Sequence, residues 1–403
     1  MHSGPFLRRL TIWNYKSISL AQIDLGSLAF LVGPNGSGKS NCLDAIRFVA
    51  DALRTSLDHA LRDRGTIKEV RRRSGGHPTH FALRLDFQLP DGGTGHYAFR
   101  VGARPSGGYE VQKEELRVLG GAGGLGEHFY HVERGHIVVT SMRASPVSLP
   151  DRLFLVAASG QPEFRAAFDA LSRMEVYNLN PAKISAMQSP DPGLLLRRDG
   201  TNAASMLDKL DKPARLQISE YLSQIVPGVS QPETRILGSL ETIEFRQIVK
   251  GQKTPWRFYS SSMSDGTLRA LGVLLALFQN QGKPDCPPII GLEEPETALH
   301  PAAAAVLLSA LREASRHTQV LVTSHSPDLL DNPDIPTEAI LAVASEEGIT
   351  RIAPIDSAGR EMLRNRLFTV GELLRQNQIA LDPSHLADEA AEQQLKFFEH
   401  DSP

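Results

Sequence analysis

The chain has 403 residues, of which 41% are hydrophobic and 22% charged, so it can bury a core for one large domain or two to three smaller ones. Its formal net charge of −3 excludes the strong positive excess of an obligate nucleic-acid binder, and its two cysteines argue against a disulfide framework or a zinc site. The sequence shows neither a run of about 18 apolar residues nor a signal-peptide pattern, so we expect a cytoplasmic protein.

The first part of the sequence predicts strands, then a helix, then an antiparallel meander. Apolar segments around residues 7–13 and 20–32 predict strands. After a glycine-rich loop, apolar residues recur at spacings of three and four from Leu43 to Leu61, which indicates a long helix with one apolar stripe. Residues 80–157 alternate apolar and polar side chains, as half-buried strands do. The strand-like pieces of this meander are 81–89, 97–101, 109–119, 129–139 and 153–157.

The second part predicts alternating strands and helices. Residues 162–230 have a helical pattern that several prolines cut into short pieces, and a hairpin is expected at about 236–260. From residue 264 helices alternate with apolar strands, which indicates a mostly parallel sheet covered on both faces. The expected strands are 288–293, 319–323 and 339–343, and the intervening helices are 301–316 and 327–331. The pattern of the last 40 residues predicts helix, ending in a polar tail.

A glycine-rich loop after the second predicted strand segment carries the clearest chemistry. Its sequence GPNGSGKS, at residues 33–40, matches the phosphate-loop pattern. The glycines allow several backbone N–H groups and the start of the next helix to surround a phosphate. Lys39 offers a charge to the β- and γ-phosphates, and the Ser40 hydroxyl can bind Mg²⁺. The flanking strand and helix argue against a chance glycine turn. The expected nucleotide contacts are Gly33, Pro34, Asn35, Gly36, Ser37, Gly38, Lys39, Ser40 and Asn41.

Two acids and a histidine follow later apolar strands. Glu293 and Glu294 end the strand in PPIIGLEEPETALHP, at the sheet edge where α/β proteins bind ligands. The first acid can hold Mg²⁺, and the second can orient or deprotonate an attacking water. His325 ends the next strand, where it could reach a γ-phosphate. The alternatives are a solvated acidic turn and a structural histidine.

A serine-rich turn precedes an apolar helix at SSSMSDGTLRALGVLLAL, residues 260–277. Ser264 is suited to cap this helix. The same helix start, with Ser264, Gly266 and Thr267, is also suited to bind an anion. The two interpretations are compatible, and both stay open at this stage.

The chain has, in order, the phosphate loop, the Ser-x-Gly-Thr helix, the strand with paired acids and the strand with the histidine. This order resembles that of the ABC ATPase head of the SMC/RecF superfamily, and the motifs are most similar to those of the RecF-like and OLD-like predicted ATPases. The matching segments are NYKSI (14–18), GPNGSGKS (33–40), SDGT (264–267), LEEPETALHP (292–301), TSHSP (323–327) and LFTVGELL (367–374). The resemblance covers both ends of the chain, whereas residues 80–260 match only loosely. It implies an α/β fold of the P-loop NTPase class: an ABC ATPase head with a mostly parallel sheet, an antiparallel β meander and a short helical insertion.

The resemblance also implies roles for individual residues. Glu293 stands where most relatives have a metal-linked aspartate, and Glu294 and His325 match the catalytic glutamate and the switch histidine. Ser264, Gly266 and Thr267 match the signature motif, which in this superfamily completes the ATP site of a second head. The implied cofactors are therefore ATP and Mg²⁺, in an ATP-dependent homodimer. Two further matches are Ala298–His300 at the dimer seam and Lys16 near the nucleotide. The metal-binding glutamine has no clear match, and Gln161, between the meander and the helical region, is the candidate for it.

Four parts are expected along the chain. They are an N-terminal ATPase lobe (1–160), a helical insertion (161–235), a C-terminal ATPase lobe (236–355) and a helical tail (356–403). The region 162–230 is too short and too interrupted for the coiled coil of a true SMC protein. No acidic cluster follows His325, which argues against a built-in nuclease, and transport is not expected without a membrane segment.

Two functions remain open from the sequence. The first is ATP hydrolysis coupled to head dimerisation in DNA metabolism, such as repair or genome maintenance. The cationic segment from Arg62 to Arg73 could then contact DNA phosphates, although it could equally be a solvated connection. The second is a regulatory ATPase that controls a separate effector protein in phage defence. A scaffold that barely hydrolyses ATP is a third, simpler possibility.

Overall fold

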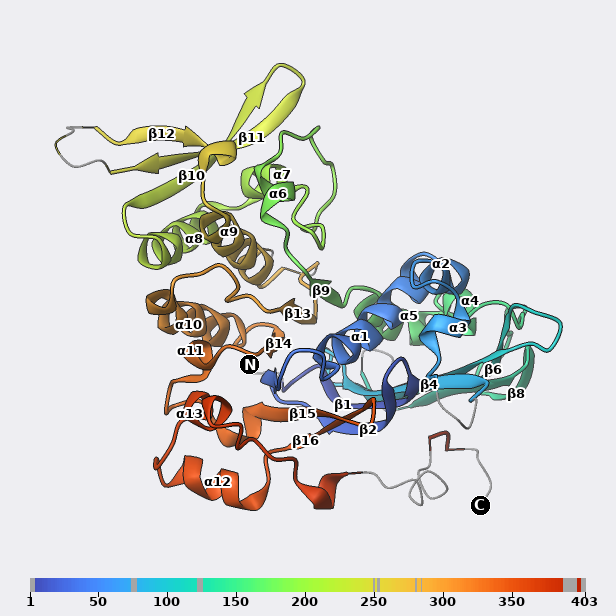
Figure 1. Ribbon diagram of the computed structural model, residues 1–403. Helices are drawn as coiled ribbons and strands as arrows, with labels where there is room; N and C mark the ends of the chain where they lie inside the picture. The colour runs from blue at the N-terminus through green and yellow to red at the C-terminus, as the bar shows by residue number, and fades with distance from the viewer. Residues whose placement is uncertain are drawn as a thin grey trace. The chain divides into compact units, whose positions relative to one another are not determined.

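The computed structural model divides the chain into two compact units, which Figure 1 shows as a ribbon. Unit 1 contains residues 1–174, 336–364 and 379–403, and unit 2 contains residues 175–335 and 365–378. The four-part division expected from the sequence remains a prediction. The structure describes residues 4–73, 78–121, 126–248, 251, 254–279, 281–283, 285–386 and 397–399.

Unit 1 is built on a mixed sheet with the strand order β8-β7-β6-β5-β4-β1-β2-β16-β15-β3. Neighbours pair antiparallel from β8 to β2 and between β16 and β15, whereas β16 pairs parallel with β2 and β15 with β3. The predicted meander is confirmed as β4 to β8. The strands are β1 (Leu7–Tyr15), β2 (Ile18–Asp24), β3 (Leu28–Val32), β4 (His80–Gln88), β5 (Thr94–Ala103), β6 (Tyr109–Leu119), β7 (Glu127–Glu133), β8 (His136–Thr140), β15 (Ile340–Glu346) and β16 (Ile349–Pro354).

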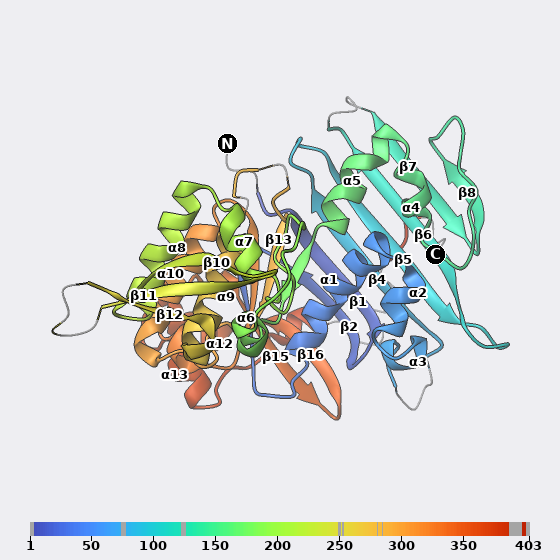
Figure 2. The same cartoon turned by 90° about the horizontal axis from the view of Figure 1, so that it is seen from above.

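Helices cover one face of this sheet, as Figure 2 shows for α1 to α5 over β1, β2 and β4 to β7. The strand alternation places Phe81 and Phe99 on that face, fully buried. The ring of Phe48 on α1 packs edge to face against that of Phe81, with 5.3 Å between the two ring centroids. Aromatic rings favour this geometry because of their quadrupoles. The helices of unit 1 are α1 (Lys39–Arg54), α2 (Leu57–Arg62), α3 (Ile67–Val70), α4 (Phe154–Ala158), α5 (Pro162–Ser172) and α12 (Ser357–Arg364).

Two sequence expectations about unit 1 are wrong. The single helix expected from Leu43 to Leu61 breaks at Thr55, because Ser56 caps a new helix, α2, by accepting a hydrogen bond from the His59 N–H. Residues 153–157, expected as a strand, form most of α4 instead. The first N–H groups of that helix, those of Phe154 and Leu155, have no acceptor within the helix and donate to the Glu114 carboxylate instead.

Glu114 is a fully buried carboxylate on β6 that joins this helix to the sheet. Its Oε1 accepts hydrogen bonds from the Tyr97 hydroxyl at 3.0 Å and the Tyr130 hydroxyl at 2.9 Å, as well as from Leu155 N at 2.8 Å. Burial raises the pKa of Glu114 to about 6 although these donors favour the ionised form. Four donors from strands and helix therefore depend on one side chain.

Unit 2 combines three parallel strands with a separate antiparallel sheet. β13 (Ile289–Glu293) pairs parallel with both β9 (Glu175–Tyr177) and β14 (Gln319–Ser324). The predicted hairpin at 236–260 is part of the second sheet, which runs β10 (Val229–Leu237), β11 (Leu240–Gln247) and β12 (Trp256–Tyr259). The helices are α6 (Pro181–Ser185), α7 (Ala203–Lys209), α8 (Lys212–Ile225), α9 (Asp265–Phe278), α10 (Ala304–Ala314), α11 (Pro327–Leu330) and α13 (Val370–Arg375).

The strand β9 was not expected, because its three residues lie in a stretch that otherwise reads as helical. The strand β16 was also missed, since its pattern is short and interrupted by polar residues. Part of the expected C-terminal helical tail, residues 387–396, lies outside the described residues. No helix in the described part of the chain combines the length and the apolar character needed to cross a membrane.

Replacing Glu114 should destabilise unit 1. Glu114→Ala leaves two phenol hydroxyls and two N–H groups without their acceptor, so we expect a loss of about 2–4 kcal/mol in the free energy of unfolding at pH 7. Because the folded state raises the pKa of Glu114, this group stabilises most at low pH, and its contribution is lost as the pH rises through about 6. The loss should therefore be larger at pH 4 than at pH 7.

Urea unfolding of both chains at pH 4 and pH 7 measures this difference. Glu110→Ala, on the same strand but only partly buried, is the matched control and should cost at most about 1 kcal/mol. An equal loss for both variants would contradict the assigned role of Glu114.

Candidate functional site

The glycine-rich loop lies between β3 and α1 in unit 1. Gly36 and Gly38 have φ values of 78° and 98°, a left-handed backbone that favours glycine. The Lys39 side chain folds back over the loop, and its Nζ donates to the carbonyls of Gly33 and Pro34, each at 2.9 Å. Ser40 is exposed at the first turn of α1. The loop thus has the wrapped backbone, the cation and the helix start that a phosphate requires.

The hairpin of β15 and β16 holds this loop from the other side. A Cβ at Gly38 would lie 2.0 Å from the Thr350 Oγ1, and one at Gly33 would lie 2.0 Å from the Val343 carbonyl oxygen. Thr350 donates to the Ser37 carbonyl at 2.9 Å. The sequence did not point to Thr350, because its position 310 residues after the loop carries no local signal.

A second hydrogen bond chain reaches the same threonine. Asn41 Nδ2 donates to Ser17 Oγ at 2.6 Å, and the two hydroxyls of Ser17 and Thr350 lie 2.7 Å apart. Asn41 was expected as a nucleotide contact, and its side chain serves here to fix the loop to β16. Its contact with a nucleotide remains a prediction.

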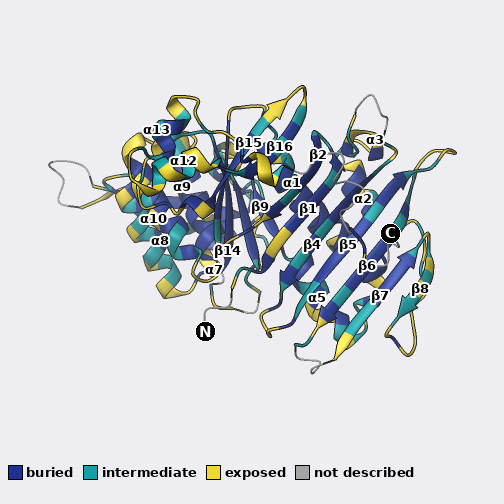
Figure 3. Ribbon diagram, turned by 90° about the horizontal axis from the view of Figure 1, so that it is seen from below, coloured by how far each residue is buried: buried dark blue, intermediate teal, exposed yellow. Residues whose placement is uncertain are grey.

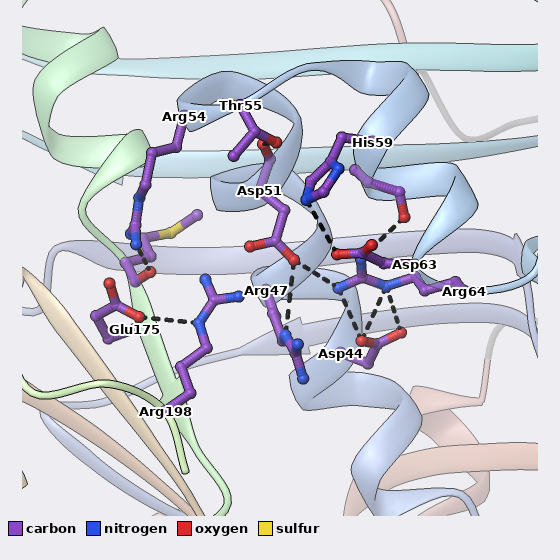
Figure 4. Close-up of polar contacts among 12 residues, drawn as sticks. Asp44, Arg47, Asp51, Arg54, Thr55, His59, Asp63, Arg64, Glu175 and Arg198 are labelled. Carbon is purple, nitrogen blue, oxygen red and sulfur yellow. Dashed lines mark hydrogen bonds and ion pairs between the residues drawn. The ribbon is translucent and has the colours of Figure 1, made fainter. Parts of the chain in front are cut away.

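Lys16 lies beside α1, next to the loop. It has a left-handed backbone, with φ of 50°, and its Nζ is 2.6 Å from Asp44 Oδ2. Asp44 also accepts from the Tyr15 hydroxyl at 2.8 Å and pairs with Arg64 at 2.9 Å. Figure 4 shows Arg64 between Asp44 and Asp51. Burial alone would raise the pKa of Asp44, but Arg64 and Lys16 outweigh it, and the pKa lies below its usual value.

These contacts correct one part of the expected DNA segment. The Arg64 side chain is only 6% exposed and neutralises two acids, so it is not part of a surface patch. Arg62 and Arg73, 75% and 71% exposed, each pair with an acid four residues earlier in the chain. Of the other cations, Lys68 is exposed. Arg71 donates to the Pro78 carbonyl, and Arg72 donates to Ser19 Oγ.

In unit 2, the acid pair and the histidine lie at the carboxyl ends of adjacent parallel strands, as predicted. Glu294 directly follows β13, and its Oε1 lies 3.0 Å from His325 Nδ1. Both side chains are about one-third exposed, at 35% and 38%. Glu294 has a left-handed backbone with φ of 43°, held by a hydrogen bond from its N–H to the Thr323 carbonyl. Such a strained non-glycine conformation is typical of functional sites.

Glu293 precedes this pair and contacts an amide that the sequence did not indicate. Asn178, directly after β9, donates from Nδ2 to Glu293 Oε2 at 3.4 Å. Because carboxylate and amide oxygens suit Mg²⁺, these two residues fit one side of a magnesium site. Gln161 stands at the N-cap position of α5 in unit 1 without capping it through its side chain, which donates to the Ala144 carbonyl, and its metal role remains a prediction. Within the described ranges, no group of three or more His, Cys, Asp or Glu residues could hold a metal.

The signature segment opens α9, and Ser264 is its cap. The Ser264 hydroxyl accepts from the Thr267 N–H at 3.3 Å and lies 2.9 Å from the Thr267 hydroxyl. Position 266 must be glycine, because a Cβ there would lie 2.4 Å from the Ala298 carbonyl oxygen. Ala298 is held with φ of 66°. A cavity of about 510 Å³ borders this contact and is lined by residues such as Gln224, Ser264, Gly266, Thr267, Ala298 and His300.

Arg269 connects the signature helix to the acid pair. Its guanidinium donates to the carbonyls of Glu293 and Glu294 at 3.0 and 2.9 Å, and to that of Leu179 at 2.7 Å. Burial lowers the pKa of Arg269, although the three nearby acids favour its charge. Sequence reasoning missed this residue, although an arginine in the apolar run LRALGVLLAL was a usable signal.

Glu296 is a further acid at this site, and the sequence did not indicate it. Its Oε1 accepts from the Ser324 hydroxyl at 2.6 Å, on the strand next to β13. Burial raises the pKa of Glu296 despite this hydrogen bond. The acid therefore holds the loop after β13 against β14, behind the Glu294–His325 pair.

Comparisons with known proteins agree with this arrangement. A family model described as an AAA domain, putative AbiEii toxin of a type IV toxin–antitoxin system, matches residues 28–107 and 150–331. A solved Smc head bound to the C-terminal winged-helix domain of ScpA is 16% identical, covers 88% of this chain and 99% of that chain, and has a TM-score of 0.54. An Smc head with an extended coiled coil from Pyrococcus furiosus is 12% identical, covers 90% and 99%, and has a TM-score of 0.55.

The comparison with curated proteins gave no match. The family match covers more than half of the chain and includes the phosphate loop, the signature segment, the acid pair and the histidine. The structural matches are too low in sequence identity to show more than the fold. The chain thus belongs to this AAA-domain family and has the fold of an SMC/RecF-like ABC-type ATPase head.

Proposed function

We propose that the chain binds ATP and Mg²⁺ at the loop Gly33–Ser40 and hydrolyses the γ-phosphate bond. The observation that carries this proposal is the Glu294–His325 contact at the ends of two parallel strands. A loop alone would account for nucleotide binding, whereas a carboxylate oriented by an imidazole provides a means to activate water. The left-handed backbone of Glu294 further supports a catalytic role over a solvated turn.

In the proposed reaction, the Glu294 carboxylate positions a water and accepts its proton as the water attacks the γ-phosphorus. The bond between the γ-phosphorus and the β–γ bridging oxygen breaks, and ADP leaves with that oxygen. His325 orients that carboxylate through Nδ1, and the position of its ring can depend on whether the γ-phosphate is present. Lys39 neutralises the phosphate oxygens. Magnesium, when bound, would neutralise phosphate charge, and Ser40 with Glu293 would hold it. Asn178 and Gln161 are the candidate amide ligands.

We further propose that a second copy of the chain completes each ATP site. Ser264 and Gly266 present the start of a 14-residue helix beside an open cavity, which is a suitable receptor for a phosphate bound by another copy. Ala298 and His300 line the same cavity and would lie at the seam. ATP would then close two heads on each other, and hydrolysis would release them.

In the cell, the proposed role of this switch is DNA metabolism, such as repair or genome maintenance. A specific observation favours a second candidate, the regulation of a separate effector protein in phage defence. The family description names a toxin–antitoxin system, and the cations of the Arg62–Arg73 segment are largely paired within the chain. The response of hydrolysis to DNA separates the two candidates.

Glu294→Gln should slow ATP hydrolysis by a factor on the order of 10²–10⁴, because the amide cannot accept the proton of water. It should still bind ATP and should accumulate as a dimer, measured by sedimentation in saturating ATP and Mg²⁺. Lys39→Ala is the matched control, which should lose both nucleotide binding and dimerisation. A Glu294→Gln chain that stays monomeric with ATP bound would contradict the two-copy site.

Arg269→Ala should reduce hydrolysis more than ATP binding, because the acid pair loses the donor that fixes its backbone carbonyls. The loss of the three hydrogen bonds from the guanidinium should also cost about 2–4 kcal/mol in the free energy of unfolding. Arg269→Lys, which keeps the charge but not the forked geometry, should recover only part of the activity. Full activity of the Ala variant, measured as kcat with folding verified by circular dichroism, would refute the assigned coupling.

A role in DNA metabolism predicts that duplex or single-stranded DNA stimulates hydrolysis. Charge reversal of two exposed cations, Arg62→Glu with Arg73→Glu, should abolish the stimulation and leave the basal rate unchanged. The control reverses Arg134 and Arg165, exposed cations outside the segment. An ATPase rate indifferent to DNA in the unmodified chain would instead support the regulatory role.

A further inference from the structure

The face of the unit 1 sheet that is turned away from α1 to α5 has a mixed surface. Figure 3 views this side, where β1 and β4 to β7 carry alternating buried and partly exposed residues. The register places Ala82 opposite Trp13 and Arg100, and Ala98 opposite Arg84 and Glu115. Two alanines surrounded by longer side chains leave a hollow in the middle of the face.

Two phenylalanines from the far end of the chain fill this hollow. Phe397 and Phe398 are buried, with exposed fractions of 4% and 0%, and they cluster with Ala82, Ala98 and Trp13. They belong to the described segment Phe397–Glu399, which we call the FFE segment. Two aromatic side chains of this size normally dominate the energy of a contact.

Cations surround the rings of the FFE segment. The Arg100 guanidinium lies 5.5 Å from the Phe398 ring centroid and 5.0 Å from that of Trp13, and Lys113 Nζ lies 5.7 Å from the Phe398 ring. Contacts of this kind favour an aromatic side chain over an aliphatic one of similar size. The hollow is therefore selective for rings.

The main chain of the FFE segment is held at both ends. Arg84 Nη1 donates to the Phe397 carbonyl at 3.0 Å, and the Glu399 N–H donates to Glu115 Oε1 at 3.1 Å. The Glu399 carboxylate pairs with Arg117 at 2.8 Å and lies 3.7 Å from His96 Nδ1. These contacts fix the direction of the segment and select an acid after the second ring.

The residues that receive the segment have other partners within the sheet. Arg84 pairs with Asp86 at 2.9 Å, and Arg117 pairs with Glu127 at 3.0 Å. Glu115 lies between His96 and His131 at 2.6 and 3.2 Å. Because these pairs orient the side chains without the FFE segment, the site is preorganised, which lowers the cost of binding.

We propose that this sheet face is a recognition site for a protein segment with two adjacent aromatic residues followed by an acid. The FFE segment occupies the site within the same chain, and a partner protein that presents a Phe-Phe-acid sequence binds by displacing it. The site is independent of the nucleotide loop, so this role goes beyond ATP hydrolysis. It provides a means by which a partner could be recruited to the ATPase.

The test vacates the site in the full chain and supplies the segment as a peptide. Phe397→Ala with Phe398→Ala empties the hollow, and a fluorescein-labelled peptide of residues 396–403, Lys-Phe-Phe-Glu-His-Asp-Ser-Pro, is titrated by anisotropy. We expect the vacated chain to bind the peptide at least tenfold more tightly than the unmodified chain, whose tethered segment competes at high effective concentration. The same peptide with both Phe replaced by Ala, or with Glu replaced by Lys, should lose binding.

Trp13 provides a second readout that does not depend on the peptide. The chain has two tryptophans, and Trp256→Phe leaves Trp13 as the sole reporter. Emptying the site should shift its emission to longer wavelength, and adding the peptide should reverse the shift. Phe258→Ala, a half-buried phenylalanine of β12, is the control and should change neither signal.

Two results would overturn the proposal. One is a vacated chain that keeps its circular dichroism spectrum yet binds the peptide no more tightly than the unmodified chain or the Ala-substituted peptide. The other is an unmodified chain that sediments as a dimer without nucleotide and becomes monomeric in the vacated variant. That outcome would assign the FFE segment to a second copy of the chain.

Discussion

The contact of Arg269 with three backbone carbonyls is the constraint on which unit 2 depends. A guanidinium inside an apolar helix is costly to bury unless its N–H groups reach acceptors. Here Nη1 donates to the Leu179 carbonyl and Nη2 to the carbonyls of Glu293 and Glu294, whereas Nε has no hydrogen-bond partner among the described residues. The backbone that carries the acid pair is therefore fixed by the same helix that begins with the signature serine. A displacement at one end of α9 would be transmitted to the acids, since neither can relax alone.

Unit 1 has a different requirement, which is to support a glycine-rich loop that has few side chains of its own to pack. The support comes from the hairpin of β15 and β16, whose Val343 carbonyl and Thr350 hydroxyl approach the loop where a Cβ would collide. Gly38 is thus required for two reasons, because its left-handed backbone favours glycine and a Cβ there would collide with Thr350. Gly33 is required for the second reason alone, the close approach of the Val343 carbonyl.

The local placement of the motifs was easier to predict from the sequence than packing was. The loop, the acid pair and His325 could be placed at strand ends because each follows a short apolar run, whereas their chemical roles stay predictions. Thr350, Asn178 and Arg269 were not, since each acts through a contact made by segments far apart in the chain. The error at residues 153–157 has the same origin, because a carboxylate 40 residues away decides that the segment forms a helix. The division into lobes and the metal-binding amide are still untested.

The cap of α9 shows why a serine, in particular, occupies position 264. Asparagine and aspartate would cap the helix equally well, because each accepts a hydrogen bond from the third N–H. A hydroxyl differs in having one proton to give while its lone pairs remain engaged. In the structure that proton and the Thr267 hydroxyl can satisfy each other at 2.9 Å. The proton could turn outward to an anion without uncapping the helix, whereas an aspartate would repel the anion. If the helix end binds a phosphate as proposed, the capping and ligand-binding roles would share a single oxygen, and the choice among capping residues would determine which ligand the helix end can accept.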